Sequence, residues 1–283
     1  MNIKKPILGI LATPYISDNF KKKYIFLKNN ILKILKENSI DHLIIPYTLN
    51  KTQLSQYLKN IDGLYLPGSQ LGNFYSTTEF KKHFKTSKYL VKKIMKINKD
   101  KRILPILGIC HGYENLMLIG EDIKLSKNIL DNFFSTIYAD NDYKTKLKLS
   151  KTAKNNKFLK NKLVFHNNSL GITPQRFKKT KKLKHIYNIL ATGIDKDNTI
   201  FIEAVKSIKY PFYGFQFHPE LANKNFLQPF FMDVKKSFAE RQENISLAKS
   251  LKFSPKKIKY KTLKCKLYQL SKNNHEKCLF YKV

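Results

Sequence analysis

A cysteine between two glycines is the residue of this sequence best placed to act as a nucleophile. Gly108-Ile109-Cys110-His111-Gly112 lies between two apolar segments, the arrangement of a nucleophile elbow, in which a sharp strand-to-helix turn presents the reactive side chain. Such a turn needs strained backbone angles and neighbours without bulky side chains. It would place the thiol at a helix N-terminus, where the helix dipole favours the thiolate. An ordinary buried cysteine at a strand end is the alternative.

A histidine late in the chain could supply the base that a cysteine nucleophile needs. His218 follows an apolar segment and is itself followed by Pro219 and Glu220. The proline stiffens the turn, and the carboxylate can fold back to hydrogen-bond the imidazole. Taken alone, a histidine is more often structural than catalytic. Together with Cys110, the pattern predicts a triad of cysteine nucleophile, histidine base and orienting glutamate.

The segments that would position these residues alternate between strand and helix. Buried strands are predicted from apolar runs, and helices from amphipathic periodicity, with strands at 7–11, 43–46, 62–68 and 103–109 and helices at 21–38, 54–58 and 78–97. Their short connections imply an α/β fold, a doubly wound and mostly parallel sheet flanked by helices in a single domain. Ligands bind such sheets beyond the carboxyl ends of the strands, where Cys110 falls.

The second half of the chain continues this pattern less regularly. Strand signals return at 163–165, 199–205 and 212–217, and a helix is predicted over 235–251. We expect residues 1–250 to form the domain and residues 251–283 to form a basic C-terminal extension. Short apolar alternations in that extension could be strands or an ordered tail.

The chain is strongly basic, with 54 Lys and Arg against 20 Asp and Glu among 283 residues, a formal charge of +34. Nucleic acid is the first partner that such a charge suggests. However, arginine occurs only at Arg102, Arg176 and Arg241, and the lysines are spread along the chain, so we do not expect a nucleic-acid partner. The alternatives are solvated lysine-rich faces or a positive field that attracts an anionic substrate.

The sequence gives no sign of a membrane or secreted protein. No apolar run approaches the roughly 18 residues of a membrane helix. The N-terminal apolar stretch breaks at Thr13-Pro14 without a small-residue cleavage site, unlike a signal peptide. Three cysteines are too few for a disulfide framework. We therefore expect a cytoplasmic protein.

The two motifs together resemble the class I glutamine amidotransferase-like superfamily, which has a Cys-His-Glu triad in this order. Pro67-Gly68-Ser69 resembles that family's oxyanion loop, with Ser69 where a second glycine is usual. The gamma-glutamyl hydrolase family (peptidase C26) is more similar still. Five segments in the same order, within residues 5 to 245, carry this resemblance: 5–11, 108–114, 165–167, 183–192 and 209–214.

The resemblance implies hydrolysis of gamma-glutamyl amide bonds, as in folyl-poly-gamma-glutamates, through a thioester on Cys110. The backbone amides of Ser69 and His111 would form the oxyanion hole. His166 would contact substrate, assist proton transfer or pack structurally, and Glu114 would bind substrate or lie on the polar side of its helix. No metal or cofactor is expected. The implied substrate is a small anionic gamma-glutamyl compound, and a homodimer stays open. Eukaryotic family members are often lysosomal or secreted.

Two other functions remain open from the sequence. The first is a related enzyme, either a hydrolase of small gamma-glutamyl amines or a glutaminase subunit that feeds ammonia to a separate synthetase. The second is a non-catalytic binding protein on the same fold. Preference for glutamine would favour the glutaminase, whereas salt-dependent binding of nucleic acid without hydrolysis would favour the binding protein.

Overall fold

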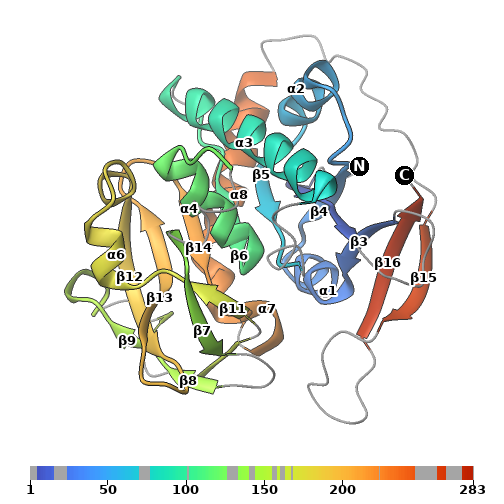
Figure 1. Cartoon of the computed structure of the whole chain (residues 1–283). Coiled ribbons are helices and arrows are strands. Elements are labelled where there is room, and N and C mark those ends of the chain that lie inside the picture. The colour runs from blue at the N-terminus through green and yellow to red at the C-terminus, as the bar shows by residue number, and fades with distance from the viewer. Residues whose placement is uncertain are drawn as a thin grey trace.

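A central sheet with helices packed on both faces organises the computed structural model of the chain (Figure 1). The structure describes residues 5–15, 24–69, 77–100, 102–125, 133–139, 144–154, 158–159, 163–166, 168–222, 224–245, 260–265 and 276–282. Among these residues the central sheet has 8 strands in the order β4-β1-β5-β6-β14-β13-β12-β9.

The first five strands of that order are parallel and position both sequence motifs. They are β4 (Asp41–Ile45), β1 (Ile7–Leu11), β5 (Gly63–Leu66), β6 (Ile106–Ile109) and β14 (Phe212–Phe215). The strands β5, β6 and β14 are buried along their whole length, which explains their continuous apolar sequences. The predicted mostly parallel α/β sheet is confirmed.

Antiparallel strands complete the sheet beyond β14. These are β13 (Ile200–Ser207), β12 (Tyr187–Ile194) and β9 (Lys148–Leu149). Two small pairs lie outside the central sheet: β8 (Lys144–Lys146) with β10 (Leu163–Phe165), and β7 (Ser135–Ala139) with β11 (Asn168–Gly171).

Helices cover both faces of the parallel part of the sheet. The main ones are α1 (Asn29–Glu37), α2 (Lys51–Lys59), α3 (Thr78–Lys99), α4 (His111–Glu121) and α8 (Gln228–Ile245). A Cβ on Gly63 would touch Val234 of α8, whereas Gly112 of α4 lies against Leu66. Since positions 63 and 66 of a strand point to opposite faces, α8 and α4 lie on opposite faces of the sheet.

Shorter helices lie in the connections between these elements. They are α6 (Pro174–Lys178), α7 (Pro219–Ala222) and the 3₁₀ turns at Lys151–Ala153, Leu183–His185 and Lys224–Leu227. None of the helices in the described part of the chain combines the length and the apolar character needed to cross a bilayer.

The helix predicted over 21–38 is wrong in its first half. Residues Tyr24–Lys28 form strand β3, and α1 begins only at Asn29. The strand has an aromatic and β-branched sequence and pairs with β2 (Thr13–Tyr15) and β16 (Glu276–Lys282). Pairing with a distant segment thus overrides the local helical periodicity. Residues 21–23 lie outside the described residues.

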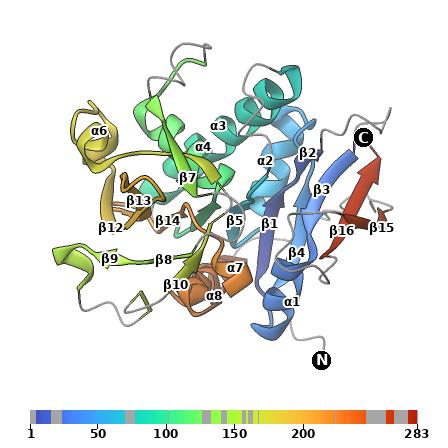
Figure 2. The same cartoon turned by 60° about the horizontal axis from the view of Figure 1, so that its bottom comes forward.

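Strands β2 and β3 belong to a second sheet, in which two strands from the expected C-terminal extension complete the order β15-β16-β3-β2 (Figure 2). β15 (Tyr260–Cys265) pairs with β16, and β16 pairs with β3, both antiparallel. Of the two alternatives for the extension, strands or an ordered tail, the structure shows strands in these two segments. The division at residue 250 stays a prediction, and residues 246–251 of the predicted last helix lie outside the described residues.

Candidate active site

Cys110 sits on the sharp turn that its sequence predicts. It lies between the end of β6 and the start of α4, with φ 52° and ψ −114°. A non-glycine residue in this region stores strain of about 1–3 kcal/mol and persists only where its surroundings hold it. One such contact is the Cys110 amide, which donates to the carbonyl oxygen of Phe215 on β14 at 2.8 Å. The predicted sharp turn between strand and helix is confirmed.

The two glycines of the motif are required by close backbone contacts. A Cβ on Gly108 would lie 2.6 Å from the carbonyl oxygen of Gly112. A Cβ on Gly112 would overlap the carbonyl oxygen of Leu66 on β5. Because both obstacles are backbone atoms, no side-chain movement could relieve them. The expectation that bulky neighbours would clash at this turn is confirmed.

His218 and Glu220 form a buried hydrogen-bonded pair just beyond β14. His218 Nδ1 lies 2.8 Å from Glu220 Oε1, and the two side chains are 3% and 1% exposed. A carboxylate can only accept, so Nδ1–H donates and Nε2 is the nitrogen left for proton transfer. The His218 amide donates to the carbonyl oxygen of Phe165 at 3.1 Å, which anchors the histidine. This pairing is the one that the His-Pro-Glu sequence predicts.

Gly68 lies between the cysteine and the histidine. A Cβ on Gly68 would sit 3.2 Å from Cys110 Cβ and 2.8 Å from His218 Cε1. The nucleophile and the imidazole therefore border the same small space, although 108 positions of sequence separate them. They meet because β5, β6 and β14 are adjacent parallel strands whose carboxyl ends share one edge. Sequence reasoning named Gly68 only as part of a loop and missed this requirement for a residue without a side chain.

The two expected oxyanion donors flank this space in the chain. Ser69 follows Gly68, and His111 opens α4, where N–H groups have no partner within the helix. The His111 ring is buried, 3.2 Å from Asn115 Nδ2 and 3.4 Å from a Glu114 oxygen. Because its side chain is held in the interior, its amide is the group available for chemistry. The oxyanion assignment stays a prediction.

Glu114 is buried among its neighbours. It is 3% exposed, and Oε1 accepts from Gln216 Nε2 at 3.4 Å while Oε2 faces His111 Nδ1. The pKa of Tyr113 is raised well above its ordinary value, first by burial of the phenol, then by the charges of Glu203 and Glu114. A substrate-binding role for Glu114 stays a prediction.

His166 uses both ring nitrogens within the protein. Nε2 lies 3.0 Å from Glu203 Oε1 and 3.1 Å from Thr145 Oγ1, and Nδ1 lies 3.3 Å from Asn168 Oδ1. The ring is fully buried. These contacts connect the β8–β10 and β7–β11 pairs to β13, which favours the packing alternative over substrate contact. Asn167, part of the same sequence segment, lies outside the described residues.

Tyr65 is a site neighbour that sequence reasoning missed. It lies on β5, is almost completely buried, and its pKa is held well above the ordinary value by burial first, then by the Glu220 and Cys110 charges. Its phenol therefore stays neutral beside Glu220 and Cys110. The sequence feature that could have indicated Tyr65 is its place in an otherwise apolar strand, three residues before Gly68.

Comparison with known proteins identifies the family. A model of the peptidase C26 family matches residues 6–220. The chain belongs to the peptidase C26 family. The match contains Cys110, His218 and Glu220 as well as the oxyanion loop, so all the expected catalytic elements lie inside the family region.

Relatives within peptidase C26 are named gamma-glutamyl hydrolases. Gamma-glutamyl hydrolase B of Dictyostelium discoideum is 28% identical over 228 residues, 76% of this chain and 62% of the relative. Gamma-glutamyl hydrolase 1 of Arabidopsis thaliana is 25% identical, over 76% of this chain and 63% of the relative. The human gamma-glutamyl hydrolase is 28% identical, over 77% of this chain and 68% of the relative. The chain thus spans less than two thirds of the length of the first two relatives.

A solved structure has the same fold. A Thermoplasma acidophilum protein described as part of a GMP synthase matches with a TM-score of 0.55 and 18% sequence identity, over 85% of this chain and 98% of that one. At this identity the likeness concerns the fold alone. The peptidase C26 chain therefore has the class I glutamine amidotransferase fold expected from its motifs.

Proposed function

We propose that this protein hydrolyses gamma-glutamyl amide bonds, with Cys110, His218 and Glu220 as its catalytic triad. The single observation that carries the proposal is the convergence at Gly68, whose missing side chain leaves space between the Cys110 and His218 side chains. The names of the peptidase C26 relatives support the choice of bond.

The reaction would proceed through a thioester. His218 Nε2 takes the proton of the Cys110 thiol. The resulting thiolate attacks the gamma-carbonyl carbon, and the backbone amides of Ser69 and His111 hold the negative charge that forms on the carbonyl oxygen. As the tetrahedral intermediate collapses, the C–N bond breaks and His218 Nε2–H protonates the departing amine. Water, deprotonated by His218, then attacks the thioester. The gamma-carboxylate leaves and the Cys110 thiol is restored.

Glu220 would keep His218 in the required tautomer. The Nδ1–H···Oε1 hydrogen bond of 2.8 Å places the proton on Nδ1, so that Nε2 can take and return a proton during each half-reaction. The carboxylate also stabilises the imidazolium that forms in between. Because the pair is buried, this stabilisation is screened little by solvent.

The proposed substrate class is anionic, with folyl-poly-gamma-glutamates as the proposed natural example. Each unit of a gamma-linked glutamate chain carries a free alpha-carboxylate, and the protein carries a formal charge of +34. A positive field of this kind raises the local concentration of polyanions and their rate of encounter.

A competition among three substrates tests the proposal. Purified protein is offered penta-gamma-glutamate, a small gamma-glutamyl amine and glutamine, and products are identified by mass. We expect cleavage of penta-gamma-glutamate with the highest kcat/KM and no turnover by Cys110→Ala. Preference for glutamine would instead assign a glutaminase, and absence of turnover on all three substrates would contradict an enzymatic role in this substrate class.

A further inference from the structure

A cavity of about 200 Å³ lies at the end of α4 opposite the nucleophile. α4 is 11 residues long, so its two ends lie about 16 Å apart at 1.5 Å per residue. The cavity walls are mostly apolar and come from α3, α4, β12 and β14: Val91, Met95, Ile119, Tyr187 and Phe212. Two lysines, Lys92 and Lys182, also line it. It is therefore separate from the catalytic site.

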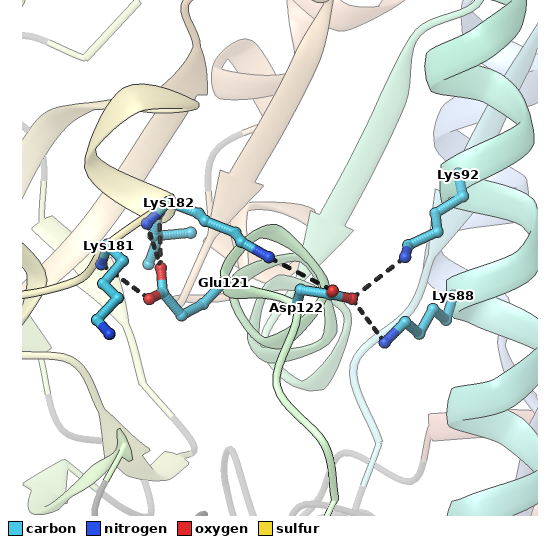
Figure 3. A network of polar contacts seen from close by, with 7 residues as sticks. Lys88, Lys92, Glu121, Asp122, Lys181 and Lys182 are labelled. Atoms are coloured by element: carbon cyan, nitrogen blue, oxygen red, sulfur yellow. Dashed lines mark hydrogen bonds and ion pairs between the residues drawn. The ribbon is translucent and has the colours of Figure 1, made fainter.

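Three lysines share one carboxylate beside this cavity (Figure 3). Asp122 Oδ1 lies 2.8 Å from Lys88 Nζ and 3.2 Å from Lys92 Nζ, and Asp122 Oδ2 lies 3.5 Å from Lys182 Nζ. Hydrogen bonds from Lys88 and Lys92 hold the pKa of Asp122 below its ordinary range, so the carboxylate stays ionised at neutral pH. The group nevertheless carries an excess of two positive charges.

The ammonium groups that line the cavity have donors to spare. An ammonium has three N–H donors, and within the described part of the chain Lys92 and Lys182 each place one on Asp122. The two side chains are 54% and 59% exposed, which lets them turn toward a ligand. Nearby Glu121 does not compete for them, because it accepts from the backbone amides of residues 181, 182 and 183 (Figure 3).

Asp122 is an unusual choice at its position. It caps the C-terminus of α4 in the left-handed conformation, with φ 60° and ψ 37°, where glycine is the common residue. A carboxylate there also meets the negative end of the helix dipole. The lysines offset the negative charge of the carboxylate and that of the helix end. As a result, lysines from α3 and from the segment before β12 meet around Asp122 at one cavity.

Tyr187 forms part of the cavity wall and is itself only 2% exposed. The site thus combines a mostly apolar lining with two ammonium groups. Ligand pockets commonly have this composition, an apolar lining with a few polar groups that fix orientation.

We propose that this cavity binds a small organic carboxylate with an aromatic or branched aliphatic body. The body would fill the apolar space, since about 150 Å³ already holds benzene, and the carboxylate would bridge Lys92 and Lys182 beside Asp122. A singly charged carboxylate suits the site better than inorganic phosphate, because most of the surroundings are apolar and a dianion is costlier to desolvate.

Methyl NMR of methionine tests this proposal without a catalytic readout. The chain has 4 methionines, of which Met95 lines the cavity and Met232 is 62% exposed on α8. Benzoate is titrated into the labelled protein at constant ionic strength, with benzyl alcohol and phosphate as matched probes. We expect benzoate to shift the Met95 signal saturably, with a Kd on the order of 1–10 mM, while Met232 does not move.

The expected differences between probes and variants define the outcome. Benzyl alcohol, which lacks the charge, should bind at least about fivefold more weakly, and phosphate should leave Met95 unshifted. Lys92→Gln with Lys182→Gln should weaken benzoate binding about tenfold, whereas the control Lys81→Gln with Lys85→Gln on the same helix should change it less than twofold. No Met95 shift, equal binding of benzyl alcohol, a phosphate shift, or equal loss in the control would each overturn the proposal.

Discussion

The strained turn at Cys110 and the missing side chain at Gly68 both shape the space that Cys110 and His218 border. The turn presents the thiol at the edge of the sheet, and the glycine leaves room for the imidazole to approach. Together they bring Cys110 and His218 to the border of one space, which the proposed chemistry requires.

Gly68→Ala tests this arrangement at a single atom. The added Cβ would lie 2.8 Å from His218 Cε1 and 3.2 Å from Cys110 Cβ, so we expect kcat/KM to fall by about 100-fold or more, since misplacement of about 1 Å has effects of this size. Gly9→Ala is the matched control away from the site, because its Cβ would crowd the side chains of Ile61 and Ile45, with the nearest atoms at 2.8 and 2.9 Å. Steady-state kinetics with thermal unfolding compares the two. Equal activity of both variants would contradict the arrangement.

The placement of Cys110, His218 and Glu220 could be predicted from sequence, whereas the surroundings of His166 and Glu114 could not. Cys110, His218 and Glu220 stand in short motifs in which the neighbouring residues themselves indicate the geometry. The partners of His166 are Glu203 and Thr145, which lie 37 and 21 positions away on other strands. No local pattern marks such pairs, because only the assembled sheet brings them together.

At the scale of elements, the parallel strands carry the site because neighbouring strands end at the same edge. β5 brings Gly68, β6 brings Cys110 and β14 brings His218. These strands could be predicted because each is a continuous apolar run. Strand β3 could not, because its partner β16 lies at the other end of the chain and its residues fit a helical period equally well.

The last helix is tied to the sheet by a buried ion pair. Arg241 of α8 donates from Nε to Asp62 Oδ1 at 2.6 Å and from a terminal nitrogen to Asp62 Oδ2 at 2.9 Å. Asp62 is fully buried before β5 and also accepts from the Ile7 amide at 2.8 Å. The pair thus joins α8 to the beginnings of β1 and β5, at the end of the sheet away from Cys110.

Arg241→Met should therefore destabilise the fold and spare the chemistry. Removing the guanidinium breaks the bidentate pair with the buried Asp62 carboxylate, on which the charge of Arg102 still acts, so we expect a loss of at most about 3–5 kcal/mol, the cost of a buried charge left without any partner. Urea unfolding measures this loss, and kcat at a temperature well below the midpoint should stay within twofold of the wild type. Lys235→Met, on the exposed side of the same helix, serves as the control. A loss below about 1 kcal/mol would show that Asp62 does not depend on Arg241.

At the scale of the whole molecule, the main feature is the formal charge of +34. Net charge alone does not locate a binding site. The sequence indicates a positive field but not that Lys88, Lys92 and Lys182 converge on Asp122. That convergence depends on the packing of α3 beside the end of α4, which brings together positions about 90 residues apart. The positive field therefore follows from the composition of the chain, whereas the lysine cluster beside the cavity follows from its fold.

Salt dependence tests whether the field acts on the substrate. Raising sodium chloride from about 50 to 500 mM shortens the screening length roughly threefold. We expect kcat/KM for penta-gamma-glutamate to fall about tenfold, mainly through KM, because the polyanion loses its attraction to the lysines. A gamma-glutamyl amine with a single carboxylate should lose less than about threefold. The same loss for both substrates would refute steering of the polyanion.

Mass analysis of the covalent intermediate examines the central chemistry most directly. Protein that is turning over a gamma-glutamyl substrate is quenched in acid, and its intact mass and peptides are measured. We expect an adduct equal to the acyl part of the substrate, mapped to the peptide that contains Cys110 and absent from Cys110→Ala. Hydrolysis by Cys110→Ala within tenfold of the wild-type rate, or an adduct on Cys265 or Cys278 in its place, would contradict a mechanism based on the Cys110 thiolate.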